Sequence, residues 1–177
     1  MRTEYLKHVD TVDDSELRLL MDQYGNEVWK YAYILTRNRE QAKDIAQEVF
    51  IKAHYNIHTF RGQSTIKTWL LAITRNLSLN YLSSGYFRKI LLFGNMKTPQ
   101  SAPSAETAFL DEQSASEVWG IIMKLSHKLR EVLVLDLEHE LSVQETAKLL
   151  NLPEGTVKSR LHRARKEVEN QLKGWVQ

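Results

Sequence analysis

Cysteine is absent from the 177-residue sequence, and glycine and proline are scarce, with 7 and 3 copies. Without cysteine there is no disulfide framework, thiolate metal site or cysteine nucleophile, and a reducing cytoplasm is the default compartment. The shortage of glycine and proline disfavours a turn-rich sandwich or barrel. The longest apolar runs, 69–73 and 90–93, fall far short of the ~20 residues that a membrane span needs, and the N-terminus has no signal-like apolar core. We therefore expect a cytoplasmic chain that is not inserted in a membrane.

The net charge is also small, because the sequence contains 24 Lys and Arg and 22 Asp and Glu, which gives +2. A protein that binds nucleic acid by itself is usually visibly basic. The balance hides a local asymmetry, since residues 156–166 contain five basic residues and no acidic one. The charge therefore directs attention to one segment rather than to the whole chain.

A stretch poor in large apolar residues, 96–106, contains two of the three prolines and is predicted to be a linker. On both sides apolar residues recur at helical spacing, with no long period-two alternation and no internal repeat. The helices are expected at about 13–35, 42–53, 65–81, 118–125, 129–137, 142–150 and 155–172. The prediction is an all-α fold of two small helical domains, 1–86 and 114–177, joined by a flexible linker at 87–113.

The last two predicted helices have the form of a helix-turn-helix. Residues 142–145, Ser-Val-Gln-Glu, form a capping box, and the short turn 151–155 contains Pro and Gly. On a helical wheel, Val157 shares one apolar stripe with its i+4, i+7 and i+11 neighbours, and the basic residues face the other way. Such a face suits phosphates and major-groove base edges. The alternative is a solvated helix whose cations favour its C-terminal dipole, although here they begin in the first turn.

Three runs together carry a family resemblance. Residues 141–166, LSVQETAKLLNLPEGTVKSRLHRARK, resemble the region-four helix-turn-helix of extracytoplasmic-function (ECF) sigma factors of bacterial RNA polymerase. Residues 44–53, DIAQEVFIKA, and 60–76, FRGQSTIKTWLLAITRN, are similar to the family's region 2.2 and regions 2.3 to 2.4. The resemblance implies a non-enzymatic, cofactor-free subunit that binds core RNA polymerase and directs promoter-specific initiation.

The resemblance assigns polymerase binding to the helix at 44–53, which in the family docks on the clamp helices of the largest subunit. The residues so assigned are Asp44, Gln47, Glu48 and Lys52. They lie on the face opposite the predicted core stripe. The alternative is a solvated helix face on which Glu48 and Lys52 pair at i, i+4, worth only ~0.3–0.5 kcal/mol.

By the same resemblance, the loop at 58–65 and the helix after it capture the −10 element as a single strand. Holding an unstacked base requires planar side chains and edge hydrogen bonds, which this segment offers. The residues assigned are His58, Phe60, Arg61, Gly62, Gln63, Ser64, Thr65, Lys67, Arg75, Asn76 and Asn80. Two alternatives remain here: Phe60 plugs the core under the loop, and Asn80, which falls in the apolar arc, is hydrogen-bonded internally instead of facing a ligand pocket. Trp69 is more simply a core residue.

The −35 element is expected to be read as duplex DNA by the last helix. The residues assigned are Thr156, Lys158, Ser159, Arg160, His162, Arg163, Arg165 and Lys166. The family often works under an anti-sigma factor, commonly membrane-anchored, so the resemblance also implies such a partner. The apolar run 90–93 is hypothesised to help dock polymerase or an inhibitor.

Two other classes of function fit the sequence less well. An enzyme is disfavoured because His139-Glu140 lacks the second histidine of a zinc-protease helix and no phosphate-cradling glycine loop is present; no metal site is expected. A conventional helix-turn-helix regulator that binds duplex DNA as a dimer explains the C-terminal helices. It gives no role to the loop at 58–65 or to the helix face at 44–48.

Overall fold

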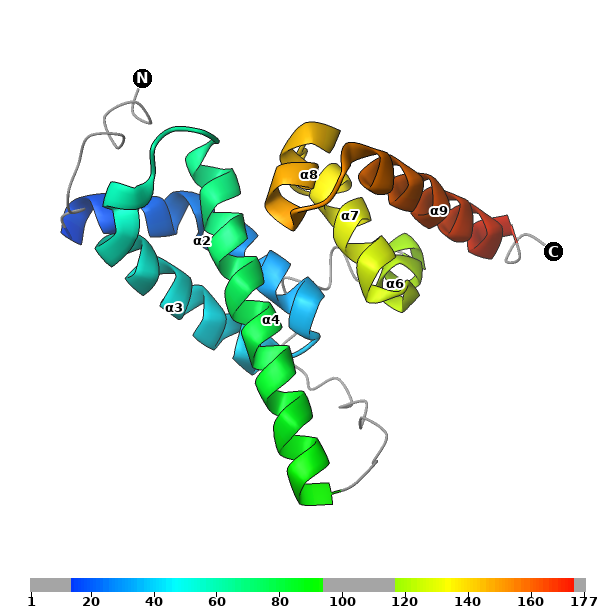
Figure 1. The fold of residues 1–177 in the computed structure, drawn as a ribbon, viewed down its shortest axis with the longest axis horizontal. Coiled ribbons are helices and arrows are strands. Elements are labelled where there is room, and N and C mark those ends of the chain that lie inside the picture. The colour runs from blue at the N-terminus through cyan, green and yellow to red at the C-terminus, as the bar shows by residue number, and fades with distance from the viewer. Residues whose placement is uncertain (1–13, 94–116, 174–177) are drawn as a thin grey trace.

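The computed structural model describes residues 14–93 and 117–173, and every regular element in these two ranges is helical. The N-terminal half contains α2 (Asp14–Thr36), α3 (Arg39–Asn56), the 3-10 turn η2 (Ile57–Thr59) and α4 (Ile66–Phe93). The C-terminal half contains α6 (Glu117–Lys124), α7 (His127–Leu137), α8 (Val143–Leu150) and α9 (Glu154–Lys173). The all-α prediction is confirmed (Figure 1). Within the described ranges, no helix has the length and apolar content that a membrane span requires.

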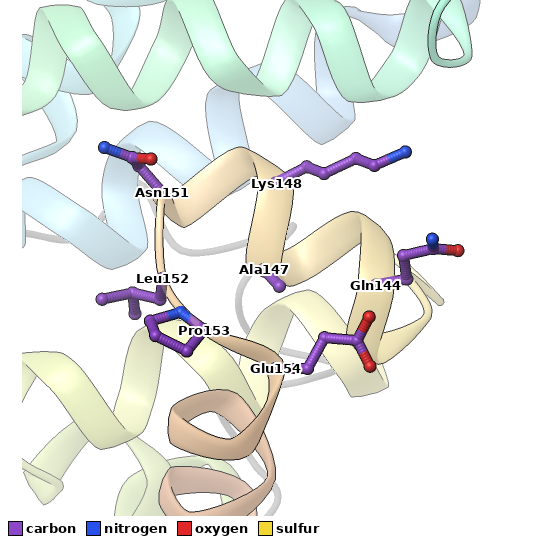
Figure 2. Close-up of a pocket in the computed structure, with 7 residues that line it drawn as sticks. All are labelled: Gln144, Ala147, Lys148, Asn151, Leu152, Pro153 and Glu154. Carbon is purple, nitrogen blue, oxygen red and sulfur yellow. The ribbon is translucent and has the colours of Figure 1, made fainter.

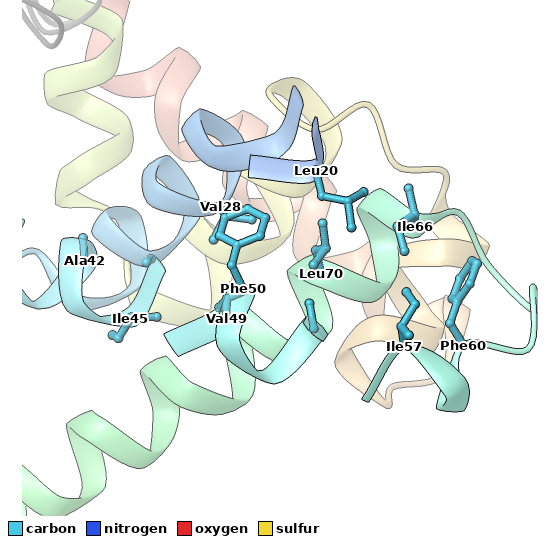
Figure 3. Close-up of a cluster of buried hydrophobic side chains, with 12 residues drawn as sticks. Leu20, Val28, Ala42, Ile45, Val49, Phe50, Ile57, Phe60, Ile66 and Leu70 are labelled. Carbon is cyan, nitrogen blue, oxygen red and sulfur yellow. The ribbon is translucent and has the colours of Figure 1, made fainter. Parts of the chain in front are cut away.

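The three long N-terminal helices pack around one apolar core (Figure 3). Residues at helical spacing on each helix contribute to it, among them Val28 from α2, Val49 from α3 and Leu70 from α4. The turn between α2 and α3 is tight, because Arg37 adopts a left-handed φ of 56° and the Asn38 side chain accepts a hydrogen bond from the Gln41 amide. The core thus fixes α3 and the loop after it against α4.

Helix α4 continues well past the bundle (Figure 1) and ends at Phe93, inside the segment predicted to be linker from residue 87. Asn80, left open between an internal hydrogen bond and a ligand pocket, is exposed, whereas neighbouring Tyr81 is half-buried against the N-terminal core. Its place in the apolar arc therefore does not bury it, and its role as a DNA contact stays a prediction. Residues 90–93 are helical, but their side chains, like residues 94–113 of the predicted linker, lie outside what the structure describes.

In the C-terminal half, the predicted capping box is present. The Ser142 hydroxyl accepts from the Glu145 amide at 3.2 Å, and the Glu145 carboxylate accepts from the Ser142 amide at 2.9 Å. Helix α8 ends at Leu150, its C-cap Asn151 adopts a left-handed φ of 53°, and α9 begins three residues later at Glu154. On α9, Val157 and Leu161 are buried. The sequence-predicted helix-turn-helix is therefore built as expected.

The two halves pack directly against each other, with α7 beside α2 and α8 beside α4. Tyr31 and Leu71 from the N-terminal half share one buried cluster with Leu135 and Leu150 from the C-terminal half. A second cluster joins Ile34 of α2 to residues of α6, α7 and α9. We call this contact between α2/α4 and α6/α7/α8 the seam.

Candidate polymerase and nucleic-acid interfaces

The face of α3 predicted to bind polymerase is open to solvent. Its members Asp44, Gln47, Glu48 and Lys52 are all exposed. The Lys52 ammonium lies 3.6 Å from the Glu48 carboxylate, so the i, i+4 pair of the alternative reading does form, without closing the face. Sequence reasoning missed two apolar neighbours, Ile51 and Tyr55, which are 57% and 70% exposed. Both could have been found from the sequence, because they lie outside the core stripe of the helix and are four residues apart, on one face.

The loop predicted to capture the −10 strand is held to the core by the buried side chain of Phe60. Phe60 is only 3% exposed, and its ring centroid lies 5.7 Å from that of Trp69. The core alternative is thus confirmed for Phe60, and Trp69 also packs on this core. Gly62 adopts a φ of 68°, a conformation that favours glycine. The Thr65 hydroxyl accepts from the Thr68 amide at 3.1 Å, capping the start of α4.

Between the anchor and α4, the loop displays its polar side chains to solvent. The exposed members are His58, Arg61, Gln63, Ser64 and Thr65. They have the aromatic, guanidinium and hydrogen-bonding groups that single-stranded bases need. The chain therefore presents these groups from a rigid support, as a binding loop should.

The two cations predicted on α4 already have partners within the protein. Lys67 lies 2.9 Å from the Glu27 carboxylate of α2. Arg75, with its side chain 21% exposed, lies 2.9 Å from the Glu131 carboxylate of α7. Asn76 and Asn80 are exposed. Arg75 is thus held across the seam by a residue of the other half of the chain.

Glu131 is the centre of a buried polar network that sequence reasoning missed. It is 3% exposed, and it accepts hydrogen bonds from the Arg75 guanidinium and, at 3.3 Å, from the Tyr31 hydroxyl. Burial raises the pKa of the fully buried Tyr31 phenol, and the Glu131 charge raises it further. The phenol therefore stays a neutral donor to this carboxylate.

Arg130 links the ends of two helices. It is 4% exposed, and its guanidinium donates to the Ile34 carbonyl of α2 and the Leu125 carbonyl after α6, each at 3.1 Å. The last carbonyls of a helix have no partner within the helix, so a cation there satisfies them and the helix dipole together. Burial lowers the pKa of Arg130 to about 10, which leaves it charged at neutral pH. The signal in the sequence was a pair of adjacent charges inside the apolar run 129–135.

The edge of the seam carries further polar contacts. The Lys30 ammonium of α2 lies 2.6 Å from the Glu138 carboxylate. His139 is buried, with its ring edge-on to Tyr31 and its Nδ1 3.7 Å from the Glu27 carboxylate. The hydrogen-bonding influence of His139, then that of Lys67, lowers the pKa of Glu27 to about 2 although partial burial opposes this. Charged pairs thus flank the apolar clusters of the seam.

The outer face of α9 contrasts with the seam. Lys158, Ser159, His162, Arg163, Arg165 and Lys166 are exposed, whereas Thr156 and Arg160 are half-buried. Among the residues that the structure describes, the Arg163 guanidinium donates to the Ser159 carbonyl of its own helix, at 3.4 Å. The Arg165 guanidinium reaches Asp136 of α7 at 2.8 Å. The predicted basic face is therefore present, with one of its cations tied to the helix behind it.

Comparisons with known proteins identify the two halves separately. Residues 20–86 match the family described as Sigma-70 region 2, and residues 116–168 match Sigma-70, region 4. The ECF RNA polymerase sigma factor SigW of Bacillus subtilis is 30% identical over 177 residues, covering 95% of each chain. The chain belongs to the ECF family of RNA polymerase sigma factors. The ECF RNA polymerase sigma-E factor of Haemophilus influenzae is 31% identical, covering 94% of this chain and 93% of the relative.

The fold of this sigma factor also has a solved counterpart. It resembles the sigma factor RpoE of Bartonella quintana, solved with the anti-sigma factor NepR, with a TM-score of 0.73 and 24% identity. The match covers 88% of this chain and 96% of RpoE. The region 2 match spans most of α2 through α4, and the region 4 match contains the helix-turn-helix. A conventional duplex-binding regulator is not favoured, since it does not explain the first of these matches.

One hollow lies beside the turn of the sigma factor's helix-turn-helix (Figure 2). It has a volume of about 500 Å³ and a mixed lining of Gln144, Ala147, Lys148, Asn151, Leu152, Pro153 and Glu154. In Figure 2, Lys148 and Asn151 stand on the side of α8 nearer α4. Among the described residues, no group of His, Asp and Glu is arranged to hold a metal ion.

Proposed function

We propose that this sigma factor joins core RNA polymerase through the exposed face of α3 and reads promoters with two separate surfaces. The loop at 58–65 captures the −10 non-template strand, and the outer face of α9 reads the −35 major groove. The observation that carries the proposal is that one chain displays both a polar loop on a rigid anchor and a basic helix-turn-helix face. A duplex-binding regulator needs only the second.

For polymerase, the proposed contact is the acidic and amide face formed by Asp44, Gln47 and Glu48, with Lys52 at its edge. Exposed Ile51 and Tyr55 adjoin it and add apolar area. A patch with an apolar centre and a polar rim is the usual composition of a protein interface. The clamp helices of the largest subunit are the proposed partner.

For promoter DNA, the −10 proposal keeps the loop residues His58, Arg61, Gln63, Ser64 and Thr65 as direct contacts, while Gly62 shapes the loop. Phe60 serves it as the buried anchor, and its stacking on a base stays a prediction. Lys67, Arg75, Asn76 and Asn80 extend the surface along α4. For −35, the exposed side chains of α9 are proposed as direct contacts, with half-buried Thr156 and Arg160 at the margin.

The proposed domain boundaries remain 1–86 and 114–177, and the proposed compartment is the cytoplasm, where polymerase and chromosome meet. The proposed regulator is an anti-sigma factor. Its support is the likeness in fold to RpoE, which was solved with one. Neither polymerase binding nor promoter recognition requires covalent chemistry by this chain.

The polymerase contact is tested by reversing one charge. Glu48→Lys should lower affinity for core polymerase by about tenfold or more, because a like charge facing a complementary interface costs several kcal/mol. Co-elution with core polymerase in gel filtration and runoff transcription measure this. Asp22→Lys is the matched control, since Asp22 is an exposed acid on another helix of the same half. Full core affinity of the Glu48→Lys variant would remove the α3 assignment.

A further inference from the structure

We infer that Asp136 competes with DNA for Arg165, so that the outer face of α9 binds a promoter with one of its cations held back. The inference deepens the proposed function and rests on it, because it concerns how strongly α9 holds the −35 element. Asp136 acts through Arg165, whose guanidinium a DNA phosphate must take from the Asp136 carboxylate. The pair thereby sets the affinity of α9 for DNA without reading its sequence.

The ion pair joins α9 to the end of α7. The Arg165 guanidinium donates to the Asp136 carboxylate at 2.8 Å, and the two helices pack against each other. The Asp136 side chain is 23% exposed, whereas that of Arg165 is 61% exposed. A guanidinium has five N–H donors, and this one remains within reach of an anion from outside. Arg165 can therefore exchange its internal acceptor for a phosphate oxygen.

Arg165 differs in this respect from the other cations of its segment. Of the five basic residues at 156–166, it alone forms an ion pair within the part of the chain that the structure describes. Lys158, Arg163 and Lys166 are exposed on the same helix. The carboxylate of Asp136 therefore withholds one particular cation and leaves the rest of the basic face available.

The local structure of α7 does not explain an acid at position 136. The negative end of a helix dipole favours basic residues, but the last turn of α7 contains none. Asp136 lies in that turn, and the C-cap is a second acid, Glu138. Asp136 thus costs its own helix stability, and its partner is on α9. Departures from a local rule are expected at positions that serve function.

A phosphate competes for the same guanidinium. In a helix-turn-helix the second helix lies in the major groove, so the cations on its sides lie near the phosphates that border the groove. Each neutralised phosphate releases counterions and adds about 0.9 to the slope of log affinity against log salt. An exposed ion pair is worth a factor of about five at most. The pair therefore weakens −35 binding by up to about fivefold and makes it less dependent on salt.

Binding of the holoenzyme to promoter DNA tests this competition. The probe is a dye-labelled duplex promoter fragment that the wild-type holoenzyme transcribes, titrated between about 50 and about 200 mM salt. Asp136→Asn removes the charge and keeps the shape of the side chain. It should tighten binding by about two- to fivefold at the lowest salt concentration and steepen the salt slope by about 0.9. The double variant Asp136→Asn/Arg165→Gln should return the slope to the wild-type value, because the released cation is gone.

Glu169→Gln is the matched control. Glu169 pairs with Lys173 on the same helix, so this variant also removes one carboxylate from an ion pair of α9, outside the residues assigned to DNA. Its slope should equal that of the wild type. Unchanged or weaker binding by Asp136→Asn would overturn the competition. An equal steepening in Glu169→Gln, or a slope that stays steep in the double variant, would overturn it too. Circular dichroism verifies folding, and Asp136→Ser replaces Asp136→Asn, with the same expected results, if that variant unfolds.

A second fragment separates this inference from the proposed function. It has the same sequence as the first except at −35, where the bases are replaced. If the wild-type holoenzyme bound both fragments equally, −35 reading by α9 would fail, and the role of Arg165 with it. A preference for the original fragment, together with wild-type slope and affinity in Asp136→Asn, would overturn the competition and leave the proposed function standing.

Discussion

Two arginines assigned to DNA, Arg75 on α4 and Arg163 on α9, differ sharply in their surroundings. The Arg163 side chain is exposed and donates a hydrogen bond to a carbonyl of its own helix. The Arg75 side chain is 21% exposed and paired with buried Glu131. The comparison teaches that the proposed −35 surface is open to solvent in this form of the chain, whereas Arg75 of the proposed −10 surface is held by an internal partner.

The cause of this difference lies in how the helices pack. Helix α9 buries one stripe, including Val157 and Leu161, and leaves its other face to solvent. Helix α7 is buried nearly all round, from Arg130 to Leu135, because the N-terminal half covers the side that the C-terminal core does not. The buried charges of α7, Arg130 and Glu131, therefore need partners across the seam, whereas a charge on α9 can remain hydrated.

The largest expected effect comes from removing the carboxylate at the seam. Glu131→Ala leaves Arg75 and the Tyr31 hydroxyl without their partner and should cost ~3–5 kcal/mol of folding free energy. Urea unfolding of Glu131→Ala, Arg75→Ala and the double variant measures the coupling between the two residues. If the single effects add within about 0.5 kcal/mol, the two side chains do not interact in solution.

The next largest effect concerns the exposed arginine. Arg163→Ala should weaken −35-dependent transcription by ~1–3 kcal/mol, roughly 5- to 150-fold, if the guanidinium reads a base. Runoff assays on promoters that differ only at −35 measure it. An equal loss on every −35 variant would make Arg163 a phosphate contact, and no loss at all would remove it from the surface.

A smaller effect is expected at the start of the helix-turn-helix. Ser142→Ala removes the cap of α8 and should cost ~1 kcal/mol of folding free energy, without changing the coupling between Glu131 and Arg75. Ser84→Ala is the control, because the Ser84 hydroxyl is exposed and donates to the Tyr81 carbonyl of its own helix. A Ser142 effect no larger than the control would contradict the capping box.

The smallest expected effect is a pH dependence at the edge of the seam. Glu27 has a folded-state pKa of about 2, below the ordinary 4.5, so its ionised form stabilises the folded chain above pH 4.5. That contribution is lost as the pH falls from 4.5 toward 2. Urea unfolding at pH 5 and pH 3 should therefore show a gap between wild type and Glu27→Gln that shrinks at the lower pH. A gap that stays constant would contradict the pairing with Lys67 and His139.

Local features of this chain could be predicted from the sequence. The helix starts, the capping box at Ser142 and the buried stripe of α9 each follow from residues a few positions apart, and the structure confirms them. For Phe60 the sequence left two alternatives, a core residue under the loop and a ring that stacks on a base, because an aromatic ring in a loop can serve either purpose. Its burial shows that it is part of the core.

Features that depend on distant parts of the chain could not be predicted. Arg75 was assigned to the −10 element, and no local pattern indicated that its guanidinium would pair with Glu131, 56 residues away. Asn80 lies in the apolar arc of α4 yet is exposed, because periodicity alone does not show how far neighbouring helices cover each position. The residue-level polymerase and DNA contacts stay predictions for the same reason, since their partners are other molecules.

Small-angle X-ray scattering of the free chain tests closure of the two halves most directly. A closed chain of this length should have a radius of gyration near the roughly 16 Å of a compact protein, slightly enlarged by its tails. The Glu138→Lys variant, which places two ammonium groups against each other at Lys30, should have a larger radius of gyration. The double variant Lys30→Glu/Glu138→Lys, which restores the pair with its charges exchanged, should return to the wild-type radius. A wild-type radius well above about 20 Å, unchanged by either variant, would show that the halves do not close on each other and would contradict the covered state of Arg75.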